Sequence, residues 1–385
     1  MEVEGFRRPA WQQLLGGARP SPGDYPNMGD GEPGDWMHGW QFYACTARNL
    51  FFREHVLLPS LQPASAAILR SGSGDKAGFW LQTLPTCRAT TMEPSCFQVA
   101  LRRRLRIPLP LVQGTCGQHS GHGCRTRIDP LGDHLAACPR TGLLARRANP
   151  IERGWTRVLR EAGARVAPKQ LLRDTNVPLA NPDDQRQLDL VAYGLAPDGV
   201  ALCCDATMVS PLQRDSRPIS HAANVDGAAL AAAERRKRAH YVELDHSPYC
   251  RLMVLGCEVG GRWSDDSLRL VSMASRQKVL GVPRLLRSSA RQAWCARWWG
   301  MLSVCAQVAL ASTLLGTAPG MRSMAQGEEV TLTDAWHHLH GTSSDSRLPL
   351  GGFRWLFLSP WAVRAGEAGH LDIGWRVSSS SRDPS

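Results

Sequence analysis

The chain has 385 residues, of which 43% are hydrophobic, and it carries a formal net charge of +11 at pH 7. This length and apolar content allow a buried core and more than one domain, which excludes a chain that is disordered throughout. The basic excess, mostly arginine, is typical of proteins that bind polyanions, and we expect nucleic acid rather than a membrane as the partner.

The N-terminal region is rich in Pro, Gly and Arg, so we expect it to be loosely ordered, except for a short apolar piece at residues 54–59 that could dock on the body. It begins without an apolar h-region, so we expect no secretory signal and a reducing compartment for the twelve cysteines. A helix with a basic face is predicted over residues 97–105. The segments that we expect are an N-terminal region (1–75), a short helical segment (76–110), a Cys/His knuckle (111–147), an α/β core (148–264), C-terminal helices packing on the core (265–319) and an irregular tail (320–385).

Cysteine and histidine residues cluster in the third segment with the spacing C-x9-H-x3-C. Four such ligands form the closed tetrahedral site that structural zinc prefers. The alternative is a loop with scattered cysteines, but ligands this dense in a short polar segment would have no other means of ordering it. The predicted zinc ligands are Cys124, His134, Cys138 and a fourth, for which we prefer Cys116 to His122.

The fourth segment has the pattern of alternating elements. A helix is predicted from Pro150 to about Gly163, because proline favours the first helical position and glycine the end. Strands are predicted at 165–172, around Asp189 and around Asp205, followed by a helix from Asp226 to about Leu244 and a strand at 252–259. The predicted order is therefore α-β-β-β-α-β.

Two aspartates stand out because each lies in an apolar, strand-forming run that ordinarily excludes charge. Asp205 follows Asp189 by 16 positions, which suits two antiparallel strands joined by the Gly/Pro turn at 194–199. The two carboxylates can then converge and bind a divalent ion such as Mg²⁺ or Mn²⁺. The alternative is a pair of carboxylates at strand edges that are neutralised by surface arginines.

The helix after these strands carries one lysine, Lys237, within a basic run. A lysine near two metal-binding carboxylates can polarise a water molecule or a phosphate. The neighbouring Arg235, Arg236 and Arg238 are expected to neutralise nucleic-acid phosphates, although the same run could be a solvated basic face. Further along, residues 301–315 are apolar but too short for a bilayer, so we expect a core helix there.

Several of these motifs resemble the C-terminal part of site-specific non-LTR retrotransposon proteins, over about two thirds of the chain. The matching stretches are Leu57 to Leu61, Gly132-Asp133-His134 with Cys138, Arg186 to Asp189, Cys204 to Thr207 and Gly260 to Trp263. In that family a zinc knuckle precedes a restriction-like endonuclease with the PD-(D/E)XK fold.

The resemblance implies that Asp189 and Asp205 bind the catalytic metal. The family's lysine can stand on the following helix, which matches Lys237, with Tyr241 completing a K-x3-Y pattern. Glu152 or Glu161 on the opening helix would supply a further acid of that fold.

We therefore expect a metal-dependent endonuclease that nicks DNA, with RNA of the parent element as a second ligand and the nucleus as its location. A second hypothesis is a zinc-stabilised nucleic-acid-binding module without catalysis. A third is a structural α/β domain whose charge reflects arginine-rich coding bias.

Overall fold

A four-stranded mixed sheet lies at the centre of the structure, a computed structural model that describes residues 48–111, 114–118, 123–175, 177, 183–245, 247–316 and 330–340. Its strands are β1 (Arg165–Leu171), β2 (Gln187–Tyr193), β3 (Ala201–Val209) and β4 (Cys250–Glu258), and they lie side by side in chain order. The pairs β1/β2 and β2/β3 are antiparallel, whereas β3/β4 is parallel. The mixed α/β class is confirmed.

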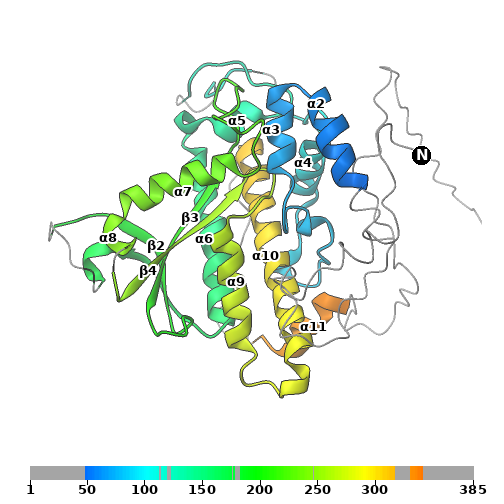
Figure 1. The fold of residues 1–385 in the computed structure, drawn as a ribbon. Helices are drawn as coiled ribbons and strands as arrows, with labels where there is room; N and C mark the ends of the chain where they lie inside the picture. Colours follow the sequence, from blue (N-terminus) through cyan, green and yellow to red (C-terminus); the bar gives the residue numbers. More distant parts are fainter. Residues whose placement is uncertain are drawn as a thin grey trace, which may run out of the picture. The chain divides into compact units, whose positions relative to one another are not determined.

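Helices cover both faces of the sheet (Figure 1). On one face, α6 (Leu143–Glu161), α9 (Asp265–Lys278) and α10 (Arg287–Leu315) share a core with Leu190, Leu202 and Leu255 of the strands. On the other face, α7 (Ala228–His240) and α8 (Val242–Asp245) cross between β3 and β4, where Tyr241 and Leu244 pack on alternate strand residues. The elements thus follow the predicted order, with the short α8 added.

The first helix of this set begins earlier than predicted, because Pro150 lies inside α6 rather than at its start. The preceding residues include alanine, leucine and arginine, which favour helices strongly enough to extend the helix past one missing N–H. The carbonyl of Pro150 accepts a hydrogen bond from the Cys305 thiol at 2.7 Å. The expected boundary between residues 147 and 148 therefore falls within a continuous helix.

The helix that carries Lys237 is shorter than predicted, since it ends at His240 and not near Leu244. Tyr241 leaves the helical conformation (φ −121°, ψ 49°), is buried, and donates a hydrogen bond to the Gln187 carbonyl at 2.7 Å. Its side chain therefore ties the end of α7 to the start of β2.

Part of the N-terminal region is helical, so the expectation of loose order does not hold for residues 53–71; residues 1–47 lie outside the described part. Helix α3 (Pro63–Ser71) buries Ala67 and Ile68 against Leu212 and Ala222. The other elements are η2 (Arg53–Leu57), α2 (Leu58–Ser60), η3 (Phe79–Leu81), η4 (Arg88–Thr90), α4 (Pro94–Arg104), α5 (Asp133–Ala137), η5 (Pro139–Thr141), η6 (Leu172–Asp174), η7 (Arg284–Leu286) and α11 (Leu332–His340). Helix α4 confirms the basic helix predicted at 97–105, and the apolar piece at 54–59 is helical.

Gly260 and Gly261 explain how the chain after β4 packs on α3. A Cβ atom on Gly260 would lie 2.4 Å from the backbone of Ser71, and one on Gly261 would lie 2.3 Å from the Ala77 carbonyl oxygen. Only glycine fits such a close backbone approach. This pair therefore fixes the N-terminal helices against the end of the sheet.

Helix α10 is long and apolar enough to cross a membrane, with a mean hydropathy of 1.4 over its best window, yet 89% of that window is buried inside the protein. Its tryptophans, Trp294, Trp298 and Trp299, are buried in the main core. Helix α10 is therefore buried as a core helix is. All described residues belong to one compact unit.

Candidate active site and metal cluster

The hairpin of β2 and β3 brings Asp189 and Asp205 to neighbouring positions. Oδ2 of Asp189 accepts a hydrogen bond of 2.9 Å from the backbone N–H of Ala206, the residue after Asp205. Asp205 lies on the face covered by α7, opposite the side on which Cys204 and Ala206 enter the main core. The convergence predicted from the two apolar runs is therefore present.

Asp205 is 2% exposed and is held by Lys237 from α7. The Lys237 Nζ lies 2.7 Å from Oδ1 and 2.9 Å from Oδ2. Burial raises the pKa of the Asp205 carboxyl above its ordinary value; Lys237 opposes this rise and Asp189 adds to it. Oδ1 is buried and its close contact is the ion pair with Lys237 Nζ.

A third carboxylate, Glu152 of α6, joins the cluster through a lysine that sequence reasoning missed. Nζ of Lys169 lies 2.6 Å from Oε2 of Glu152 and 2.8 Å from Oδ1 of Asp189. Burial raises the pKa of Glu152, with Asp189 adding to the rise and Lys169 opposing it. Lys169 has a left-handed backbone (φ +53°) within β1, which a side-chain pattern does not reveal. The cluster thus contains three carboxylates and two lysines.

Glu161, the alternative to Glu152, does not join this cluster. It accepts hydrogen bonds of 3.0 Å from Arg297 and from the indole N–H of Trp298, and one of 2.9 Å from Arg157. Burial raises the pKa of Glu161, but Arg297 and Arg157 outweigh it and hold the pKa below its ordinary value. Glu161 therefore joins α6 to α10.

Tyr241 lies next to the cluster. Its hydroxyl donates to Gln187, as described above, and burial together with the Asp205 charge raises its pKa far above the ordinary value. A tyrosine in this state is a hydrogen-bond donor and not a base.

The basic residues of α7 divide into two groups. Arg238 is engaged within the protein, where it contacts Glu234, Asp245 and Asp266 at 2.9–3.1 Å. Arg235 and Arg236 are exposed and form no ion pair within the described residues. Only the latter two are available for phosphate.

The predicted zinc ligands Cys116, Cys124, His134 and Cys138 form a cluster that could hold a metal ion such as zinc. Their ligand atoms all lie within 4.8 Å of one another. The Sγ atoms of Cys116 and Cys138 are 3.8 Å apart and those of Cys138 and Cys124 are 3.7 Å apart. A tetrahedron with Zn–S bonds of about 2.3 Å has edges of nearly this length. His122, the alternative ligand, lies outside the described residues.

The local chain explains this geometry. A short β-bridge between Thr115 and Arg127 presents Cys116 and Cys124, and α5 presents His134 and then Cys138. Asp133, the residue before His134, forms ion pairs of 2.8–3.0 Å with Arg103 and Arg106 and does not join the cluster.

His134 is oriented by a contact outside the knuckle. Its Nδ1 lies 2.5 Å from the carbonyl oxygen of Arg214, in the loop after β3, and Nε2 lies 3.2 Å from Cys124 Sγ. If Nδ1–H donates to this carbonyl, Nε2 is left as the ligand, which is the usual arrangement for metal-bound histidine. The cluster therefore links the knuckle to the strand that carries Asp205.

The thiols themselves differ in acidity. Burial acts to raise the pKa of Cys124, but hydrogen bonds, first those with Thr126, outweigh it and lower the pKa to about 6. Burial raises the pKa of Cys138 to about 11. The Cys124 thiol is thus more readily ionised than the Cys138 thiol.

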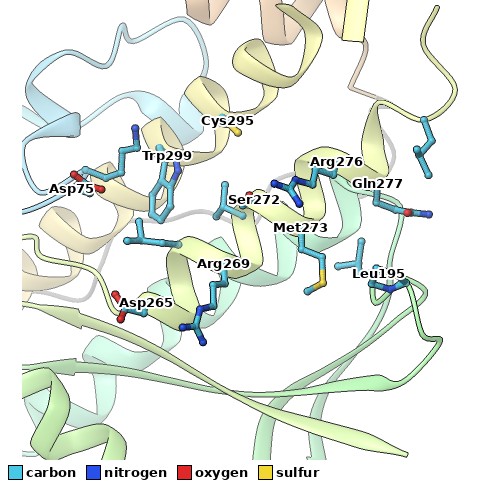
Figure 2. A pocket seen from close by; sticks show the side chains of 15 residues that line it. Asp75, Leu195, Asp265, Arg269, Ser272, Met273, Arg276, Gln277, Cys295 and Trp299 are labelled. Atoms are coloured by element: carbon cyan, nitrogen blue, oxygen red, sulfur yellow. The ribbon is translucent and has the colours of Figure 1, made fainter. Parts of the chain in front are cut away.

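A cavity along α9 is separate from both clusters. It has a volume of about 790 Å³ and lies along α9, with Ser272, Met273 and Trp299 on its wall (Figure 2). Neither the three carboxylates nor the Cys/His ligands line it.

Comparison with known proteins gave no relative: no protein-family model, no curated protein and no solved structure matches this chain.

Proposed function

We propose that the chain is a metal-dependent endonuclease that nicks DNA. The observation that carries this proposal is the convergence of Glu152, Asp189 and Asp205 with Lys237, from four different elements. Glu152 and Asp205 are buried and burial raises the pKa of each, which is typical of carboxylates at sites that perform acid–base or metal-assisted chemistry.

The order of elements supports the same proposal. A helix, three antiparallel strands, a crossing helix and a fourth strand parallel to the third are found in this order. This is the order that the PD-(D/E)XK fold implies, and we propose that residues 148–264 form such a core. We also propose, from the resemblance described above, that the chain derives from a non-LTR retrotransposon protein.

The donor set suits Mg²⁺ or Mn²⁺, which prefer carboxylate oxygens. Asp189 and Asp205 would hold the ion, and Lys237 would give up its 2.7 Å contact with Oδ1 of Asp205 for the ion to bind there. A bound ion would supply charge for the phosphate and lower the pKa of a coordinated water molecule.

The roles of the protein groups follow from their positions. In hydrolysis, water attacks phosphorus, the P–O3′ bond breaks, and O3′ takes up a proton, so that the nick has a 3′-hydroxyl and a 5′-phosphate. Lys237 would turn from Asp205 to a non-bridging phosphate oxygen and offset the charge that develops there. Arg235 and Arg236 would bind backbone phosphates, and a zinc-bound knuckle would hold the duplex beside the cluster. Nuclear location and contact with the parent element's RNA are further parts of the proposal.

The test is nicking of supercoiled plasmid by zinc-loaded protein, with Mg²⁺ or Mn²⁺ added or omitted. Chelators are left out because they would also remove zinc. The proposal predicts metal-dependent nicking that falls at least 100-fold in Asp205→Asn, while Glu161→Gln, assayed at a temperature where it is folded, retains activity. Nicking that is equal in Asp205→Asn and wild type would refute it.

A zinc-stabilised binding module without catalysis is the second candidate, and one observation favours it. Each carboxylate of the cluster is already paired with a lysine at 2.6–2.8 Å, so the charges are largely balanced. For such a module, DNA binding would weaken with salt and would be the same in wild type and Asp205→Asn.

A further inference from the structure

Lys169 lies where a second cation would bind in a cluster of three carboxylates. Its Nζ is the common partner of Glu152 at 2.6 Å and Asp189 at 2.8 Å. Because both oxygens are within hydrogen-bonding distance of one nitrogen, they face the same point in space. A Mg²⁺ ion at that point would need only to draw the oxygens to about 2.1 Å.

The backbone aims this lysine at the carboxylates. The neighbours Pro168 and Gln170 pair with Leu190 and Leu188, so Lys169 lies opposite Asp189. Its φ of +53° is a left-handed conformation, which is unfavourable for a non-glycine residue in a strand. Strain of this kind persists where surrounding contacts fix the side chain, and here the contacts are the two carboxylates.

The other half of the carboxylate cluster has different partners. Asp205 and Oδ2 of Asp189 lie on the other side, where Ala206 N–H and Lys237 are the partners. Lys237 comes from a helix and lies at the buried carboxylate, whereas the Lys169 side chain is 45% exposed. The two lysines therefore neutralise separate halves of the cluster.

We propose that Lys169 is a resident cation that fills the Glu152–Asp189 half, so that the protein binds a single divalent ion, between Asp189 and Asp205. This inference rests on the proposed function and specifies the metal stoichiometry of the same site. Lys169 is thus a positioning residue, which keeps Glu152 out of the metal's ligands.

The test counts bound Mn²⁺ by electron paramagnetic resonance of the free ion, with zinc-loaded protein and no DNA. Thiolate and imidazole ligands favour zinc over Mn²⁺, so the knuckle does not contribute to the count. We expect one bound Mn²⁺ in wild type and two in Lys169→Met, because the freed Glu152 can then bind a second ion. Lys169→Arg retains the charge and should bind one.

Three controls make the result specific. Lys278→Met makes the same change at a lysine that lies over the Trp294 ring, and it should bind one ion. Glu152→Gln in the Lys169→Met background should return the count from two to one. Circular dichroism melting and zinc content show that each variant is folded.

The outcomes separate the inference from the proposed function. Two ions in wild type, or one in folded Lys169→Met, would overturn the inference and leave a metal site intact. No bound Mn²⁺ in any variant would overturn both, because the proposed function itself requires an ion at Asp189 and Asp205.

Discussion

At the scale of single residues, the charge of Asp205 depends on Lys237 for neutralisation, because the Asp205 side chain is only 3% exposed. The Lys237 side chain is 35% exposed. Lys237→Met would leave a buried carboxylate without its cation, which is costly even for a partly exposed partner. We expect a loss of about 1–2 kcal/mol in the free energy of unfolding, measured by urea denaturation without divalent ions.

Adding Asp205→Asn to that variant removes the uncompensated charge and should recover most of the loss. With the single Asp205→Asn variant measured as well, the double-mutant cycle isolates the pair from other effects of each change. Equal stability of Lys237→Met and the double variant would contradict the view that the uncompensated Asp205 charge is what destabilises Lys237→Met.

The pKa of Glu161 is shifted in the opposite direction from that of Glu152, so the contribution of Glu161 to stability depends on pH in a way that can be tested. Its folded-state pKa is lowered, so it stabilises the fold when pH is above the ordinary carboxyl pKa of about 4.3, and this stabilisation is lost as pH falls through the folded value. Glu161→Gln should lower the free energy of unfolding by about 3 kcal/mol at pH 7, because Arg297 is left buried.

Urea denaturation at a series of pH values checks this, with exposed Glu93→Gln as the neutral control. The advantage of wild type over Glu161→Gln should shrink below about pH 4. An advantage that stays constant through that range would contradict the assignment of the ion pair.

At the scale of elements, the Cys/His cluster could hold a metal ion such as zinc, and His134 joins it to the loop after β3 through the Arg214 carbonyl. We propose that such an ion orders the knuckle. Cys138→Ser should therefore reduce bound zinc well below one ion per chain and lower the Tm by more than about 5 °C. Cys295→Ser, on the wall of the α9 cavity, is the matched control and should retain zinc. Metal analysis of the purified proteins decides the point, and full zinc content in Cys138→Ser would exclude Cys138 as a ligand.

The sequence predicted β2, β3 and β4 well because most residues of these strands are buried and each strand has a short apolar run bounded by turn residues. The edge strand β1 has no fully buried residue. It also predicted that Asp189 and Asp205 converge, since the short turn between β2 and β3 leaves few alternatives. Lys237 joins them after the longer connection of residues 210–227. Helix ends were less predictable: Pro150 suits the first turn of a helix equally well, and only the packing of α6 on α10 shows that the helix continues.

Side-chain partners could not be read from the pattern. Glu152 and Glu161 lie on the same helix, and only the tertiary positions of Lys169 and Arg297 assign one to the cluster and the other to the core. Lys169 was missed because its place depends on one left-handed residue in β1. Arg238 was included with its neighbours because a run of basic letters does not reveal its three acidic partners.

At the scale of the whole molecule, the net charge of +11 predicts DNA binding that weakens steeply with salt. Replacing both Arg235 and Arg236 by alanine should reduce the slope of log affinity against log salt by about 1–2, since each phosphate contact contributes roughly 0.9. Fluorescence anisotropy with a duplex at several salt concentrations measures the slope. Arg284→Ala, an exposed arginine in η7, should leave the slope nearly unchanged, and an equal effect of both changes would refute a specific role for α7.

The most direct test of the central claim is a comparison of wild type and Asp205→Asn for plasmid nicking in Mg²⁺, with both proteins zinc-loaded and shown to be folded. The account predicts that wild type converts supercoiled plasmid to nicked circles with ligatable 3′-hydroxyl ends, and that Asp205→Asn does so at least 100-fold more slowly. Absence of nicking by folded wild type in both Mg²⁺ and Mn²⁺, with DNA still bound, would contradict the claim and favour a binding module.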